Sequence, residues 1–257
     1  MTDFSYQLYS SRNFPPLSDT LKMLGDAGYA QVEGYGALFA DLGDIATLKS
    51  DLDANGLHMA TGHIGLESLE NNVQANLEIA NALGLEAIYC PHLVAEDRPD
   101  TAQGWREFGA RLQAASKPYV DAGLVFGWHN HDFEFIAMED GQVPMDLILE
   151  GGPDLTWEAD IAWIVRGGGN PFAYIAKYAS RITAVHVKDI ANEGECIDED
   201  GWADVGQGFV DWPRLMAALE ATDARYFVME HDNPNDAARF ATRSLKAAKE
   251  YKGTENG

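Results

Sequence analysis

The sequence predicts one parallel α/β barrel of eight strand–helix units, a (β/α)8 barrel that spans residues 1–257. Short apolar runs alternate with longer amphipathic runs along the chain, which is typical of successive βα units. The 257 residues divide into eight units of about 32 residues each, and eight right-handed units close naturally into a barrel. No glycine-rich phosphate loop follows the first strand, which disfavours an open doubly wound sheet.

Eight short runs have the composition of strands, with β-branched and aromatic residues bounded by turn residues. We expect strands at Ser5–Ser10, Tyr29–Tyr35, Leu57–His63, Ala87–Pro91, Leu124–His129, Leu155–Asp160, Ile182–His186 and Tyr226–Glu230.

The intervening segments have apolar residues at spacings of three and four, which predicts amphipathic helices. We expect helices at Leu17–Ala27, Asp44–Ala54, Leu66–Leu83, Thr101–Ala122, Asn170–Ala179, Trp212–Ala221 and Asn235–Tyr251, and a shorter one at Pro144–Leu149. Gly56, Gly84 and Gly123 follow three of these helices. A helix end of this kind favours a left-handed residue, so these glycines mark helix stops.

Composition and charge narrow the class of protein. Hydrophobic residues make up 46% of the chain and charged residues 23%, which suits a folded domain rather than a disordered chain. A net charge of −23 repels phosphate backbones, so we expect no nucleic-acid partner. Cys90 and Cys196 are too few for a disulfide framework. The chain opens without a signal-peptide pattern and has no membrane-length apolar run, so we expect a soluble cytoplasmic protein.

Imidazoles and carboxylates recur at the predicted strand ends. The groups concerned are His63, His92, His129, Asp160, His186 and Glu230. In a parallel barrel the reactive groups gather at the C-terminal ends of the strands. A lone histidine at such a position is more often a hydrogen-bonded rim residue. Recurrence on strands five to eight instead predicts one divalent-metal site.

Strand periodicity ranks the candidate ligands. Glu158 and Asp160 share a face, and Asp160 lies nearer the strand end, which favours Asp160 as the ligand. Two interpretations of Glu158 remain open: it has a functional role, or it is a buried carboxylate paired inside the barrel. His129 and His131 likewise share a face. For Lys188, an ion pair with Asp189 that orients the loop stands beside a catalytic role.

The donor set indicates the chemistry of the site. A mixture of histidine and carboxylate without thiolates suits Mn²⁺, Mg²⁺, Co²⁺ or Zn²⁺. Such an ion binds a carbonyl and a neighbouring hydroxyl and stabilises the enediolate formed when the adjacent carbon loses a proton. Glu230 is the natural acid or base for that proton. Trp163 is placed to form a wall for a sugar, and the backbone of 206–208 to contact substrate oxygens.

Five segments in order resemble the xylose-isomerase-like TIM-barrel superfamily, and more narrowly the proteins called sugar phosphate isomerase/epimerase. They are Trp128-His129-Asn130-His131-Asp132-Phe133-Glu134-Phe135, Glu158-Ala159-Asp160-Ile161-Ala162-Trp163, His186-Val187-Lys188-Asp189, the stretch 205–212 and Met229-Glu230-His231-Asp232. The resemblance covers nearly the whole chain. It implies one metal held from strands five to eight, with Asp160, His186 and Glu230 matching three of the family's ligands.

Two positions depart from the family pattern. His129 stands where the epimerases have their first glutamate, and Trp163 stands where many relatives have a substrate-contacting histidine. The metal set implied for this chain is therefore His129, Asp160, His186 and Glu230. One half of the paired-carboxylate proton machinery is missing, and His129, His131 or Glu158 is left to supply it. We expect contacts with the substrate from His63, His92, His131, Trp163 and Lys188.

The resemblance implies a metal-dependent sugar or polyol isomerase or epimerase that abstracts a proton next to a carbonyl, with a small carbohydrate as substrate. A lyase that dehydrates a keto-sugar or keto-inositol is the alternative, because its first step is the same. A binding protein without activity is a third reading. His63 and His92 match extra zinc ligands of the apurinic-site endonucleases, but other required histidines are absent. Relatives in this superfamily are often dimers or tetramers, so by analogy this chain could also form a homo-oligomer.

Overall fold

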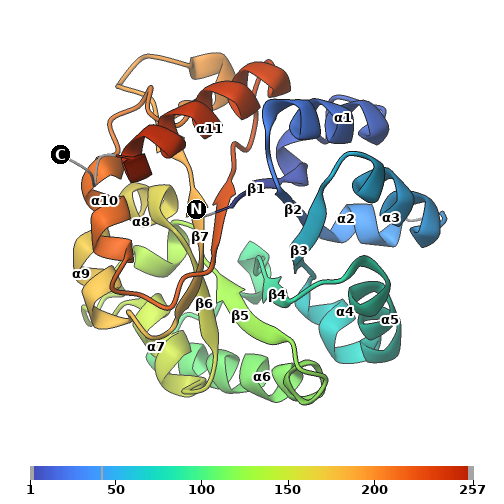
Figure 1. Cartoon of the computed structure of the whole chain (residues 1–257). Helices are drawn as coiled ribbons and strands as arrows, with labels where there is room; N and C mark the ends of the chain where they lie inside the picture. Colours follow the sequence, from blue (N-terminus) through green and yellow to red (C-terminus); the bar gives the residue numbers. More distant parts are fainter. Residues whose placement is uncertain (1–2, 42, 254–257) are drawn as a thin grey trace.

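Eight parallel strands close into a barrel, with helices around its outer face (Figure 1). This computed structural model describes residues 3–41 and 43–253. The barrel order is β1-β10-β7-β6-β5-β4-β3-β2, which confirms the predicted (β/α)8 fold. Its strands are β1 (Phe4–Gln7), β2 (Gln31–Gly34), β3 (His58–His63), β4 (Ala87–Cys90), β5 (Val125–His129), β6 (Thr156–Asp160), β7 (Ile182–Val187) and β10 (Tyr226–Met229).

Helices follow every barrel strand and form the outer ring. They are α1 (Leu17–Ala27), α2 (Gly36–Ala40), α3 (Ile45–Ala54), α4 (Leu66–Asn71), α5 (Val73–Leu83), α6 (Ala102–Asp121), α7 (Pro144–Gly151), α8 (Ile161–Arg166), α9 (Pro171–Lys177), α10 (Trp212–Leu219) and α11 (Ala237–Gly253). Short 3-10 turns occupy Leu8–Ser11, Ala95–Asp97, Phe133–Phe135 and Ile197–Glu199. Within the described ranges, every helix is too short or too polar to cross a membrane.

Several element boundaries differ from the prediction. The expected helix Leu66–Leu83 is two helices that meet at Asn72. The Asn71 side chain donates to the Glu67 carbonyl oxygen, and asparagine favours such local bonds over helix continuation. The short helices α2 and α8 and an antiparallel ribbon of β8 (Asp189–Ile190) and β9 (Trp202–Ala203) were not predicted, because segments this short lack a readable period.

Helix ends follow the local chemistry read from the sequence. Gly56, Gly84 and Gly123 have φ values of 67°, 82° and 91°, as predicted for residues after a helix. Thr101 caps α6 by accepting from the Gly104 N–H, and Asp44 caps α3 by accepting from Ala46. These stops and starts set the lengths of the connections that place the strand ends.

Alternation along the strands separates two apolar regions. The larger core lies between the strands and the helices and includes Ile88 and Cys90 of β4. Tyr89, on the opposite face of the same strand, belongs to a small separate cluster with Ala60, Ala184 and Val228. Because side chains two apart share a face, His186 points to the same side of β7 as Ala184. The barrel interior therefore carries an apolar layer and, beside it, a polar layer at the strand ends.

Helices α6 and α7 approach each other closely at two glycines. A Cβ at Gly109 would overlap the Ile148 carbonyl oxygen, and a Cβ at Gly151 would overlap the Arg106 carbonyl oxygen. This contact supports β5, β6 and their loops, which carry several of the polar residues described below.

We expect Gly109→Ala to lower the free energy of unfolding by about 1–3 kcal/mol, because the added methyl forces the two helix backbones apart. Urea unfolding followed by circular dichroism measures this loss. Gly43→Ala is the control, since a Cβ there meets nothing within 4 Å, and its effect should stay within about 0.5 kcal/mol. Equal stability of the two variants would contradict the close-packing explanation.

Candidate active site

The polar layer is built from the ends of neighbouring strands. His63 ends β3, His129 ends β5 and Asp160 ends β6, while His186 lies in β7 and Glu230 follows β10. The strand register places Asp160 opposite His186 and His129 opposite Glu158. Residues far apart in the sequence are therefore neighbours in the barrel.

Four of these side chains form what we call the rim set: His129, Asp160, His186 and Glu230. Each offers one ligand-type atom, and these atoms all lie within 4.8 Å of one another. His186 Nδ1 is 3.0 Å from Glu230 Oε2 and 3.8 Å from Asp160 Oδ2. Asp160 Oδ1 accepts from the Trp163 N–H at the start of α8, whereas Asp160 Oδ2 is buried without a hydrogen-bond partner. The four residues of the implied metal set are thus brought together.

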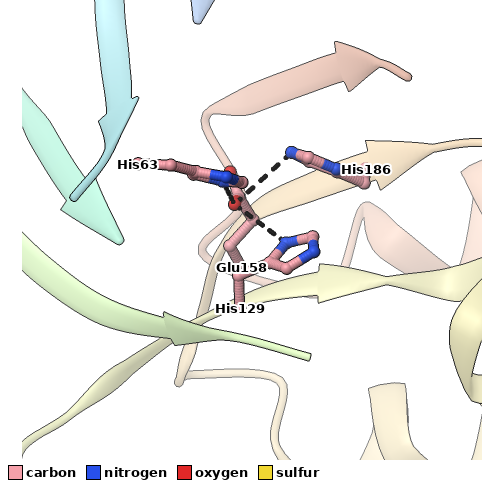
Figure 2. Close-up of side chains that lie close together, drawn as sticks. All are labelled: His63, His129, Glu158 and His186. Atoms are coloured by element: carbon pink, nitrogen blue, oxygen red, sulfur yellow. Dashed lines mark hydrogen bonds and ion pairs between the residues drawn. The ribbon is translucent and has the colours of Figure 1, made fainter. Parts of the chain in front are cut away.

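A second group, the inner set, consists of His63, His129, Glu158 and His186 (Figure 2). Glu158 Oε2 is the common point, at 2.6 Å from His63 Nε2, 3.0 Å from His129 Nδ1 and 3.4 Å from His186 Nε2. Glu158 is fully buried. It is a carboxylate paired inside the barrel, one of the two readings that the sequence left open.

Glu33 of β2 extends the inner set and was missed by the sequence analysis. Its Oε1 lies 2.8 Å from His186 Nε2 and accepts from the Gln7 side chain at 2.7 Å. The Thr61 hydroxyl donates to Glu33 Oε2 at 2.5 Å. The available signal was a glutamate in the middle of a predicted strand, since a buried carboxylate requires partners.

Lys188 lies under the rim set and is fully buried. Its Nζ is 2.5 Å from Asp232 Oδ2, 3.1 Å from Glu230 Oε2 and 3.8 Å from Asp160 Oδ2. The ammonium also lies 4.1 Å from the centre of the Trp202 ring, a cation–π contact. It therefore balances the charge of several carboxylates at once.

The suggested ion pair between Lys188 and Asp189 is wrong. Asp189 accepts the backbone N–H groups of Ile190, Gly206, Gly208 and Val210, so it pins the loop before α10. The predicted role of the backbone at 206–208 in binding substrate oxygens is corrected for the same reason. At Gly206 and Gly208 those N–H groups point at a carboxylate of the chain itself.

Two further residues position the end of β5 and the start of α8. The Asn130 side-chain oxygen accepts from the Trp157 indole and from the Asp160 N–H, and its amide donates to the Asp160 carbonyl oxygen. Glu134 accepts from the Trp128 indole and from the His131 N–H. Sequence reasoning treated both as parts of a motif and could not assign these contacts, because they join residues whose spatial relation depends on the barrel.

Burial and mutual contact shift the pKa values of the buried acids in opposite directions. Burial raises the pKa of Asp160 to about 7. Burial alone would also raise the pKa of Glu230, but the Lys188 ammonium and the His186 imidazole outweigh it and hold that pKa well below the usual range. Burial opposes ionisation of Glu158 too, yet His186 and His63 hold its pKa well below normal.

The pKa values of the buried histidines also shift in opposite directions. Burial would lower the pKa of His186, but Glu158 and Glu230 raise it well above the ordinary value. By contrast, burial and the neighbouring His186 lower the pKa of His129 to about 3. Burial and the adjacent His129 likewise hold the pKa of His131 well below normal. His129 and His131 are therefore neutral imidazoles, the form that binds metals and accepts protons.

A cavity of about 390 Å³ opens over the rim set, a size typical of small-molecule sites. Its lining includes Tyr9, Tyr35, His63, His92, His129, His131, Glu230 and Asp232. Of the predicted substrate contacts, His63, His92 and His131 line this cavity, whereas Trp163 and Lys188 lie outside its lining. A larger hollow of about 730 Å³ on the flank, beside Arg98 and Pro144, touches neither the rim set nor the inner set.

Comparison with known proteins finds a matching family and a similar characterised protein. A family model described as xylose isomerase-like TIM barrel matches residues 21–250. The rhizopine catabolism protein MocC of Rhizobium meliloti is 27% identical over an alignment of 254 residues. The match covers 86% of this chain and 77% of MocC.

Two solved structures share the fold. A sugar phosphate isomerase/epimerase from Parabacteroides distasonis superposes with a TM-score of 0.80 at 19% identity, covering 96% of this chain and 94% of that protein. The IolI protein, solved with a bound zinc atom, gives a TM-score of 0.75 at 16% identity, covering 98% and 96% of the two chains.

The buried carboxyl of Glu134 generates a pH-dependent prediction. Burial raises its pKa to about 8, so this residue contributes stability below its unfolded pKa of about 4.3 that is lost as pH rises toward 8. We expect the difference in unfolding free energy between the wild type and Glu134→Gln to shrink by up to about 1.4 kcal/mol per pH unit over this window. Denaturant unfolding at pH 5, 6, 7 and 8 measures it, and a difference that grows with pH would contradict the raised pKa.

Proposed function

Because this chain belongs to the xylose isomerase-like TIM-barrel family, we propose that it is a metal-dependent sugar or polyol isomerase or epimerase. In this proposal it removes a proton from the carbon next to a carbonyl, by way of an enediolate. The observation that carries the proposal is the rim set, in which two imidazoles and two carboxylates from four strand ends converge, and two of them, His129 and Glu230, line the cavity.

The residues of the rim set suit a divalent cation. The set offers two nitrogen and two oxygen donors, a mixture that fits Zn²⁺, Co²⁺ or Mn²⁺. Asp160 Oδ2 is buried without a hydrogen-bond partner, and a metal ligand is the kind of partner that such an atom requires. When bound, the ion would polarise a substrate carbonyl and stabilise negative charge on its oxygen. MocC and the zinc-containing IolI support small-molecule chemistry on this scaffold.

We assign proton transfer to Glu230 and His131, which face the same cavity. Lys188 holds Glu230 in place through a contact of 3.1 Å. His131 is anchored by its backbone N–H on Glu134 and lines the cavity, and its Nδ1 is buried without a hydrogen-bond partner. His131 thereby takes the place of the missing second carboxylate in the family's proton machinery.

The expected catalytic role of Glu158 and His129 changes with this assignment. Glu158 is absent from the cavity lining and contacts three histidines, so we assign it a role in holding the inner histidines. His129 lines the cavity but belongs to the rim set, so we assign it to metal binding. Trp163 packs 4.7 Å from Trp202, centre to centre, and supports Lys188 rather than forming the cavity wall.

The polar cavity admits a ring or open-chain polyol. Tyr9 and Tyr35 form an edge-to-face pair at its mouth, 5.5 Å apart, and present apolar surface to one face of a sugar. Asp232 and His92 also line the cavity and supply hydrogen-bonding groups. We propose an uncharged carbohydrate as substrate, because arginine and lysine side chains are absent from the described lining residues.

We expect Glu230→Gln and His131→Gln each to lower turnover at least about 100-fold, the usual contribution of a general acid or base. Incubation with candidate ketoses and keto-inositols in D₂O, read by NMR, measures exchange of the proton next to the carbonyl. Metal content and melting temperature are measured in parallel, so that loss of the ion or of the fold is separated from loss of the proton carrier.

Glu78→Gln, at an exposed position, and His58→Gln, at a partly exposed position where the side chain contacts Glu86, are the matched controls and should exchange at the wild-type rate. Exchange without loss of water supports an isomerase or epimerase, and an unsaturated product identifies the lyase alternative. Full exchange by Glu230→Gln would end its assignment as the proton carrier.

A further inference from the structure

The inner set carries an inference beyond the proposed reaction. We propose that the barrel interior holds a second divalent-cation site, formed by His63 Nε2, Glu158, His186 Nε2 and Glu33. This site is separate from the rim set, although both contact the same histidine. The ligand chemistry is that of a zinc-type cation bound by imidazole and carboxylate.

The donor atoms lie close together, at hydrogen-bonding distances that are equal to or shorter than the donor spacing of a coordination shell, so an ion would enter by a small outward movement of the side chains. In a tetrahedral zinc site with bonds of about 2.0–2.1 Å, the donors lie roughly 3.3 Å apart. Glu158 Oε2 lies 2.6 Å from His63 Nε2 and 3.4 Å from His186 Nε2. Glu33 Oε1 lies 3.2 Å from His63 Nε2 and 2.8 Å from His186 Nε2. Both carboxylates therefore contact the same two imidazole nitrogens.

An independent observation points to a ligand at the same place. Glu158 Oε1 is buried without a hydrogen-bond partner, although Glu158 lies in the most polar part of the barrel interior. The side chains of Glu33 and Glu158 are both fully buried, and both carboxylates contact the imidazoles of His63 and His186. A divalent cation between the two carboxylates would neutralise their charge and give the unpartnered oxygen a ligand role.

His186 separates the two sites with its two ring nitrogens. Nδ1 faces Glu230 and Asp160 of the rim set, and Nε2 faces Glu33 and Glu158. One imidazole ring would therefore join both ions when both sites are filled, and both of its ring protons would pass to solvent.

The inner site has an entry path and a preference among ions. His63 lines the cavity over the rim set, so an ion that enters the cavity reaches an inner ligand directly. Two imidazoles favour Zn²⁺ or Co²⁺ over Mg²⁺, which prefers oxygen ligands and retained water. Gln7 and Thr61 donate to Glu33 and hold its carboxylate in position, as outer partners of metal ligands do.

The experiment counts ions in the full-length protein. Metal-free wild type, Glu158→Gln and Asp160→Asn are each loaded with Zn²⁺, passed over a desalting column and assayed for zinc by mass spectrometry. We expect about two ions per chain in the wild type and one in each variant. The double variant should hold none, and His58→Gln, which changes a partly exposed histidine outside both sets, should hold two.

Cobalt tests where the retained ion lies. Asp160→Asn loaded with Co²⁺ should keep a visible absorption band from a nitrogen-ligated ion, and Glu158→Gln added to it should abolish that band. His63→Gln replaces Glu158→Gln if melting curves show that the latter does not fold. The inner site is supported only if an ion lost in Glu158→Gln is retained in Asp160→Asn.

Any other pattern overturns the inner site. A single ion lost in both variants would show one shared site, and an unchanged count in Glu158→Gln would show that the inner carboxylates bind none. The rim site of the proposed function fails separately, if Asp160→Asn holds as many ions as the wild type.

Discussion

Four buried carboxylates at the strand ends constrain the whole interior. They are Glu33, Glu158, Asp160 and Glu230, each at most 6% exposed. Unpaired charges in such a place are costly, and removal of one member of a buried pair leaves the other uncompensated. The barrel meets this constraint with His186 and Lys188, which lie on neighbouring sides of Glu230. The same arrangement that balances the buried charge brings the candidate metal ligands together.

The barrel topology brings these charged groups together although each strand contributes only a few of them. Each strand contributes one or two inward groups, and the register of neighbouring strands, such as Asp160 opposite His186, sets their separation. Residues in the loops then hold the strand ends and the following backbone in position. Asn130 bridges β5 and the end of β6, and Asp189 gathers four backbone N–H groups. Such outer contacts hold reactive groups within the narrow tolerances that catalysis requires.

In our proposal, the histidine at position 129, where the family resemblance implies a glutamate, shapes the chemistry of the site. A glutamate at that position would add a fifth negative charge to the interior and a second proton carrier beside Glu230. Histidine keeps a ligand but removes that charge, and proton transfer passes to His131 in our proposal. The inner histidines extend the same trend, because His63 and His186 give the interior a more nitrogen-rich set of donors than a carboxylate pair alone. Both features favour softer divalent ions.

The amino-acid sequence by itself determined the barrel, because apolar periodicity, glycine stops and strand-end histidines are local signals. It also specified His129, Asp160, His186 and Glu230 as neighbours, since C-terminal strand ends meet at one face of a parallel barrel. Only the tertiary structure decided which group each side chain contacts. Lys188 pairs with Asp232 rather than with Asp189, and Glu33 joins His186 across 153 positions of sequence. Such pairings depend on register, side-chain direction and barrel closure, and none of these leaves a pattern in the order of residues.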